Sequence, residues 1–158
     1  VMKTALKYER GIAGGQFPSP PVIDAAIDWA RTTRRPDGSA PIDDAAVRER
    51  IVRALIDVEV CRGFAYHTAA LASEGAMFGV EGSMTKLFAS ESYKRHCREF
   101  QDLMGVEGLV THHDPDAHLG GRIEENARHA PVTTIYGGTS EINRNAVAEG
   151  HLGLPRSR

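Results

Sequence analysis

Residues 43–62 read D-D-A-A-V-R-E-R-I-V-R-A-L-I-D-V-E-V-C-R, and this stretch decides the fold class. Its apolar residues recur at steps of three and four, which places them along one face of an α-helix. The expected inward residues are Val47, Ile51, Leu55, Val58, Cys61 and Ala65. We expect this helix to span about residues 44–74, with Asp43 or Asp44 capping its start and Gly75 ending it.

Helical spacing also dominates the rest of the chain, where no stretch alternates convincingly like a β-strand. Further helices are expected over about 2–14, 20–34, 82–104 and 140–150, with a short one around 119–127. Prolines 18, 20 and 21 interrupt the first of these regions. The residues expected to point inward from 82–104 are Met84, Leu87, Phe88, Phe100 and Leu103. Long helices with short connections predict an all-α helix bundle.

Composition limits the classes of function. The chain has 158 residues, 41% of them hydrophobic, and a formal net charge of −2. This charge offers no electrostatic basis for binding nucleic acid, and no apolar run approaches the roughly 18–20 residues of a membrane span. Cys61 and Cys97 are far apart, and we interpret them as reduced thiols of a cytoplasmic protein. The chain opens V-M-K-T-A-L-K-Y-E-R within a helical pattern, so we expect a piece of a longer protein.

Two polar features have an ordinary explanation. His112, His113, Asp114 and Asp116 could suggest a metal site, but their adjacency on a loop lacks metal-binding spacing. We therefore interpret them as a solvated loop and expect no metal. Lys86 lies within the otherwise apolar run G-S-M-T-K-L-F-A, where we expect a side chain that snorkels to solvent.

Arg34 and Arg35 sit at the end of an expected helix, before Pro36. They could complement the negative end of the helix dipole, and a guanidinium there could also bind a phosphate. Spacing alone favours the first explanation.

Residues 135–142 read I-Y-G-G-T-S-E-I, a bare turn directly before a helix. Gly137 and Gly138 permit positive φ or a close approach of the backbone to a ligand. Thr139 is the expected N-cap, and the helix start offers N–H donors to an anion or a polar ring system. The same pattern also fits a glycine turn that binds nothing, so both explanations stay open.

Several blocks resemble the C-terminal domain of acyl-CoA dehydrogenases. The run Y-G-G-T-S-E-I-N-R, followed by L-G-L-P-R, is similar to the family's Y-[E/G]-G-T-[S/N]-[E/Q]-I signature near the C-terminus. The runs V-M-K-T-A-L-K-Y-E-R-G, R-T-T-R-R-P-D-G and E-G-S-M-T-K-L-F-A-S-E resemble earlier segments of that domain, in the family's order.

This resemblance implies an antiparallel four-helix bundle spanning residues 1–158, without the family's N-terminal helical and β domains. It further implies a flavoprotein that binds FAD at a subunit interface and acts on acyl-CoA. The expected partners are copies of the chain in a dimer or tetramer, or a homologous subunit. Electron-transfer flavoprotein is the implied electron acceptor.

The resemblance also assigns roles to individual residues. Arg34, or Arg35 if the match shifts by one, corresponds to an arginine that reaches the FAD pyrophosphate of a neighbouring subunit. Gly138, Thr139 and Glu141 correspond to the turn that touches FAD. The segment M-G-V-E-G-L at 104–109 matches a glycine-rich segment near the adenosine. It has Val106 for the second glycine, and Asp102 stands for the preceding glutamine.

The general base is the main departure from the family pattern. Many members place a glutamate directly after the signature tyrosine, where this chain has Gly137, which cannot accept a proton. A minority keep glycine there and carry the glutamate in an L-x-x-E-R context, which L-K-Y-E-R matches at Glu9. We therefore predict Glu9 as the base. The alternatives are a base-deficient partner subunit and a helical interaction domain without flavin.

Overall fold

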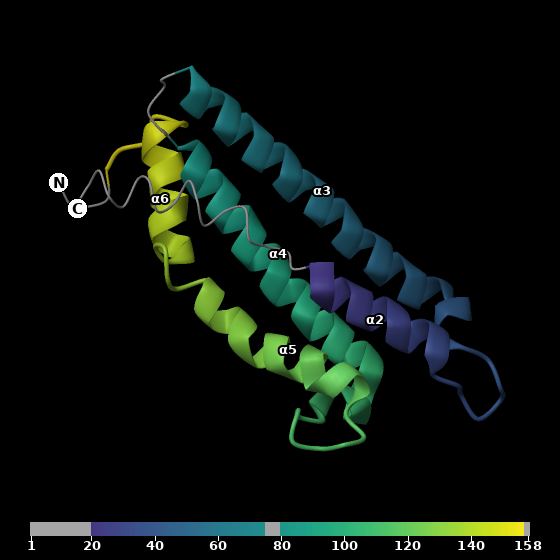
Figure 1. Cartoon of the computed structure of the whole chain (residues 1–158). Helices are drawn as coiled ribbons and strands as arrows, with labels where there is room; N and C mark the ends of the chain where they lie inside the picture. The colour runs from purple at the N-terminus through teal and green to yellow at the C-terminus, as the bar shows by residue number, and fades with distance from the viewer. Residues whose placement is uncertain (1–19, 75–79, 157–158) are drawn as a thin grey trace.

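The computed structural model describes residues 20–74 and 80–156, and every regular element in these ranges is helical (Figure 1). The α-helices are α2 (Pro20–Thr32), α3 (Ala45–Ser73), α4 (Glu81–Met104), α5 (Arg122–Thr133) and α6 (Ser140–Gly150). Short 3-10 helices are η2 (Pro41–Asp43), η3 (Gly105–Leu109) and η4 (His118–Gly121). The predicted all-α helical bundle is confirmed.

The two long helices, α3 and α4, run side by side in opposite directions (Figure 1). Helix α2 packs against both of them, while α5 and α6 lie along α4 on its other side. α4 is therefore the central helix of the bundle. The helices predicted within the described residues are found close to their expected bounds, although α5 continues six residues past the expected end at 127 and includes Pro131. The helix expected over about 2–14 lies outside the described residues.

Helix α3 begins as the sequence predicts. The Asp44 carboxylate accepts a hydrogen bond from the Ala46 N–H at 2.9 Å, so Asp44 is the N-cap. Asp43 instead accepts from the Ala40 N–H at 2.9 Å, in the preceding turn η2. The helix ends at Ser73 before Gly75, which lies outside the described residues.

The predicted inward face of α3 is correct except at Leu55. Val47, Ile51 and Cys61 are buried, whereas Leu55 is 43% exposed and Ala54 faces the core in its place. With 3.6 residues per turn, two successive steps of four rotate a side chain away from the face that began at Val47. The step from Ile51 to Ala54 corrects this drift.

The core lies where α4 meets α2, α3 and α5. Phe100 and Cys97 are fully buried on α4, with Trp29 of α2, Ile51 of α3 and Ile123 of α5 packed around them. Complete burial of a side chain such as Phe100 contributes about 1.5–3 kcal/mol to stability. Each helix thus buries its apolar face against α4.

A buried polar contact also ties α3 to α4. Asp57 of α3 accepts a hydrogen bond from Arg95 at 2.5 Å, and the same oxygen lies 2.7 Å from Nε2 of His96. His96 is only 1% exposed, and its Nδ1 lies 3.5 Å from Glu99. Since Glu99 belongs to α4 itself, the Asp57–His96 and Asp57–Arg95 contacts are the ones that join the two helices.

Lys86 does not snorkel as expected, because only 3% of the residue is exposed. It lies on α4, which is covered on most sides, so its ammonium does not extend along an open apolar surface. Within residues 20–74 and 80–156, no helix combines the length and apolar character needed to cross a bilayer.

Candidate functional site

The turn before α6 has the backbone that its two glycines predict. Gly137 has φ 66° and Gly138 has φ 91°, both in the left-handed region that side chains other than glycine rarely adopt. Thr139 follows in an extended conformation, and its hydroxyl oxygen accepts a hydrogen bond from the Ile142 N–H at 3.3 Å. Thr139 is therefore the N-cap of α6, as predicted.

Asn143 of α6 ties the turn to the helix from inside. Its side-chain Nδ2 donates to the Gly138 carbonyl at 2.8 Å and to the Thr139 carbonyl at 3.0 Å. The residue is fully buried. These contacts fix two successive carbonyl groups of the turn.

Glu91 of α4 ties the same turn to the centre of the bundle. Its Oε1 accepts from the Ser140 hydroxyl at 2.5 Å and from Arg144 at 3.3 Å. The Ser140 N–H also donates to the Thr134 carbonyl at 3.0 Å, just after the end of α5. The start of α6 is thus held by α4, by the end of α5 and by its own first turn.

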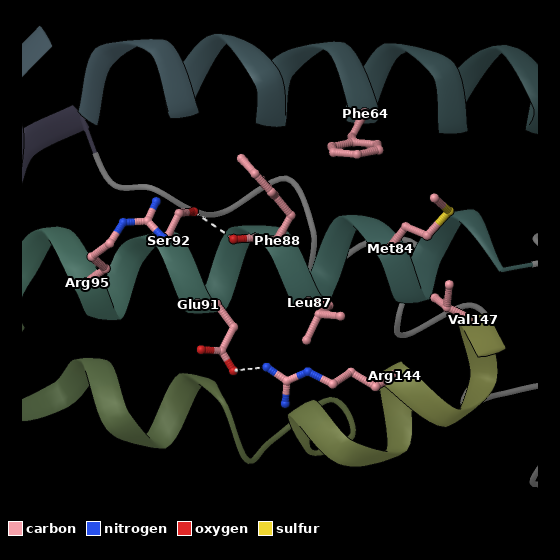
Figure 2. A pocket seen from close by; sticks show the side chains of 9 residues that line it. All are labelled: Phe64, Met84, Leu87, Phe88, Glu91, Ser92, Arg95, Arg144 and Val147. Carbon is pink, nitrogen blue, oxygen red and sulfur yellow. Dashed lines mark hydrogen bonds and ion pairs between the residues drawn. The ribbon is translucent and has the colours of Figure 1, made fainter. Parts of the chain in front are cut away.

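A pocket of about 400 Å³ lies next to this anchor, between α3, α4 and α6. Figure 2 shows the Glu91–Arg144 ion pair on its α6 side and Phe64 of α3 on the opposite side. The residues that line it are Phe64, Met84, Leu87, Phe88, Glu91, Ser92, Arg95, Arg144 and Val147. Three of the residues predicted to point inward from α4, at positions 84, 87 and 88, therefore form pocket walls.

Charge at the turn is set by local hydrogen bonds. The backbone N–H of Glu141 and then the Thr139 hydroxyl hold the pKa of the Glu141 carboxyl below its usual range. Glu141 is exposed, so it presents an ionised carboxylate beside the turn. Partial burial raises the pKa of the Tyr136 phenol above its usual value.

Arg34 and Arg35 lie beyond the C-terminus of α2, far from this turn. The end of α2 lies beside η3, past the end of α4, through the Trp29–Glu107 hydrogen bond, whereas the start of α6 lies beside the middle of α4, through the Ser140–Glu91 hydrogen bond. Nη1 of Arg34 donates to the Arg31 and Thr33 carbonyls at 2.7 and 2.9 Å, as the helix-dipole explanation expects. Arg35 forms an ion pair with Asp44 at 3.3 Å. One chain therefore does not bring Arg34 and the Gly137–Ser140 turn together.

The segment after α4 keeps one of its two glycines for a steric reason. A Cβ on Gly108 would lie 2.9 Å from the Gln101 carbonyl oxygen, closer than side chains tolerate. Val106, which stands where the family pattern has glycine, is 80% exposed and points away from the core. Glu107 accepts a hydrogen bond from the Trp29 indole at 2.5 Å, which holds η3 against α2.

Other predicted positions fall in two groups. Glu9, the predicted base, lies outside the described residues. His112, His113, Asp114 and Asp116 are exposed, and the described part of the chain brings no three potential ligands together for a metal ion.

Sequence reasoning missed Glu91 and Asn143. A polar residue four positions after an N-cap was the available signal for Asn143, because that position faces the same side of the helix as the cap. Glu91 gave no comparable signal, since its partners are 49 and 53 positions away in the sequence.

Comparison with known proteins places this geometry in context. Residues 1–152 match the family model described as acyl-CoA dehydrogenase, C-terminal domain. The acyl-CoA dehydrogenase IpdE1 of Mycobacterium tuberculosis is 31% identical over 99% of this chain, which spans 38% of that relative.

Two solved structures share the fold. The ChsE4–ChsE5 complex from Mycobacterium tuberculosis has a TM-score of 0.78 and 27% identity, covering 87% of this chain and 35% of that one. An acyl-CoA dehydrogenase from Geobacillus kaustophilus has a TM-score of 0.83 over 97% of this chain and 38% of that one, at 21% identity. The chain spans about a third of the length of the curated relatives that it matches most strongly. On this match, the chain belongs to the acyl-CoA dehydrogenase family, and residues 1–152 correspond to its C-terminal domain.

Proposed function

We propose that this chain takes part in the FAD-dependent α,β-dehydrogenation of an acyl-CoA thioester to the trans-2-enoyl-CoA. In this proposal it supplies contacts to FAD and the base that removes the α-proton. The observation that supports it most directly is the Gly137–Ser140 turn, which has two glycines of positive φ and is anchored to α4 by Glu91. An anchored turn without side chains suits close contact with a planar ring system.

The residues at the turn fit a flavin. The start of α6 offers backbone N–H groups and the positive end of a helix dipole, which favour polar ring atoms or phosphate oxygens. Thr139 adds a hydroxyl group at the turn, and the absence of side chains at Gly137 and Gly138 leaves room for an aromatic ring. We assign Gly138, Thr139 and Glu141 to FAD contacts.

Arg34 would contact a different FAD molecule. Arg34 follows α2, which ends beside η3 past the end of α4, whereas Thr139 lies beside the middle of α4, so we assign the two residues to different flavins. The guanidinium group has five N–H donors, and the two carbonyl bonds of Arg34 use one nitrogen, Nη1. A dimer or tetramer, or a complex with a homologous subunit, would bring Arg34 to the FAD pyrophosphate of a neighbour.

The α-proton requires a carboxylate base beside the substrate. We assign this role to Glu9, because Gly137 has no side chain to serve. Bound FAD would supply the hydride acceptor, and electron-transfer flavoprotein would then reoxidise it. The chain's own residues would orient the thioester and accept the proton.

A second candidate function is that of a base-deficient partner subunit. It is favoured by Gly137, which stands where many members carry the base, and by a fold relative that was solved as a complex of two differently named chains. In that case this chain would support flavin binding in a neighbour without removing a proton itself.

The test uses the complete native assembly that contains this chain. Glu9→Gln is compared with the unmodified protein by following flavin bleaching after anaerobic addition of a panel of acyl-CoAs. We expect the variant to keep its flavin and to bleach at least about 10²-fold more slowly, since it has lost its base.

The matched control is Glu49→Gln, which changes an exposed glutamate that pairs with Arg53 on the surface of α3. It should bleach at the unmodified rate. Equal bleaching of the Glu9 variant and the unmodified protein would show that the base lies elsewhere. An assembly that binds FAD but is bleached by no acyl-CoA would favour the partner-subunit function.

A further inference from the structure

The Gly138 carbonyl depends on one side chain for its position. The Thr139 carbonyl accepts both from the Asn143 backbone N–H, at 3.0 Å, and from the Asn143 side chain, also at 3.0 Å. The Gly138 carbonyl accepts from the Asn143 side chain at 2.8 Å. The donor atom of the Asn143 amide, Nδ2, is thus directed at two carbonyls of the turn.

The orientation of this amide is not ambiguous. Two carbonyl oxygens are acceptors only, so the group that faces them must be the NH₂ and not the oxygen. The amide oxygen Oδ1 then points the other way, and it has no hydrogen-bond partner among the residues that the structure describes. An unsatisfied buried acceptor is costly, and a leucine of similar size would avoid that cost but would lose both hydrogen bonds to the turn. Packing therefore does not explain why asparagine occupies this position.

Holding these carbonyls has an electrostatic consequence. Carbonyl oxygens carry partial negative charge, which would repel a phosphate or the electron-rich edge of a ring near the start of α6. The Asn143 amide offsets two of them and fixes the backbone between Gly138 and Ser140. The opening of α6 is thereby held in a single geometry.

We propose that Asn143 is a positioning residue that sets the Gly138–Thr139 backbone for flavin binding. This inference rests on the proposed function, because it assumes that the turn receives FAD. Asn143 is fully buried and acts through the turn rather than by touching the cofactor.

The test measures FAD affinity of the complete native assembly, after removal and titration of the flavin, at pH 8 and pH 5.5. Asn143→Asp has the same shape but places a carboxylate against two carbonyl oxygens. Only its protonated form can donate, and it donates one hydrogen bond in place of two. We expect the dissociation constant for FAD to rise by about 10-fold or more at pH 8, with part of the loss recovered at pH 5.5.

Two further variants make the result specific. Asn143→Ala removes the donors without adding charge, so its loss of affinity should be the same at both pH values. Asn126→Asp is the matched control, because Asn126 also donates to a carbonyl, that of Arg122, but lies on α5 away from the turn. The dissociation constant of the Asn126→Asp variant for FAD, divided by that of the unmodified protein, should be the same at pH 8 and pH 5.5.

The outcomes separate the two proposals. If the unmodified assembly binds no FAD, the proposed function fails and this inference fails with it. If the unmodified assembly binds FAD and both Asn143 variants bind it equally well, the inference alone is wrong. The same holds if the variants lower the thermal unfolding temperature of the flavin-free protein without changing the dissociation constant, because Asn143 would then serve the fold only.

Discussion

Helices α3 and α4 are neighbours of similar length, yet they are buried to very different degrees. Twelve of the 24 residues of α4 are buried, against five of the 29 residues of α3. α3 also has large apolar side chains that are exposed in this chain, namely Val52, Leu55, Ile56, Val60 and Tyr66. α4 has helices on several sides, whereas the described residues cover α3 on one side.

This difference shows that position in the bundle, more than composition, sets what a residue contributes to stability. α4 is the more polar of the two helices, yet more of its residues lose contact with water because they face other helices. Its buried polar or charged residues are Ser83, Thr85, Lys86, Ser90, Ser92 and His96. The fold of this chain should therefore be sensitive to changes along α4 and tolerant of changes on the outer side of α3.

The largest effect is expected at the centre of α4. Phe100→Ala removes a fully buried ring that packs with Trp29, Tyr93 and Ile123, and should lower the free energy of unfolding by about 3–5 kcal/mol. Urea unfolding followed by circular dichroism measures this change. Val52→Ala on the outer side of α3, where the residue is 51% exposed, is the control and should change stability by less than about 0.5 kcal/mol. Similar losses for the two variants would contradict the comparison.

The helices themselves followed from the sequence because local patterns determine them. Asp44 and Thr139 marked helix starts through capping, and both act as predicted. Leu55 was placed on the wrong face because successive steps of four residues turn the side chains gradually away from the face that began at Val47. The sequence could not show that one side of α3 is exposed, because it shows where the apolar residues lie along the helix but not which other helices cover them.

The candidate site was predictable only in part. The Gly137–Gly138 turn and its cap are local features, so their conformation could be inferred from five consecutive residues. The anchor from Glu91 and the burial of Lys86 depend on how α6 and α4 meet, which local spacing does not encode. The FAD contacts of Arg34 and Thr139 and the role of Glu9 remain proposals.

A smaller, pH-dependent effect is expected from Cys97 of α4. Burial raises the pKa of this thiol to about 12, so the folded protein keeps it protonated at a pH where the unfolded chain ionises it. Its stabilising contribution is fully present below the unfolded-state pKa and falls by about 1.4 kcal/mol per pH unit above it, until the folded-state pKa is reached.

Urea unfolding of the unmodified chain and of Cys97→Ala, each at pH 7 and pH 10, tests this expectation. The difference in stability between the two proteins should be smaller at pH 10 than at pH 7. Cys61 of α3 provides a comparison through Cys61→Ala. Burial, and after it the charge of Asp57, raises the pKa of the Cys61 thiol to about 12 as well. A difference that grows with pH for Cys97→Ala would mean that the thiol is not kept neutral by the fold.

The smallest effect is expected at Gly63, on the open side of α3. A Cβ added there meets no atom within 4 Å, and the residue sits in the interior of a helix with ordinary backbone geometry. Gly63→Ala should therefore stabilise the isolated chain by about 0.5–1 kcal/mol, because alanine loses less backbone freedom on folding. Thermal unfolding of the two chains, with Ala69→Gly as the reverse change at another exposed position of α3, measures it. If Gly63→Ala instead destabilises the native assembly while it stabilises the isolated chain, another surface must approach α3 closely at this glycine. That result would turn the exposed side of α3 from an open face into a covered one, and it would explain why its apolar residues are tolerated.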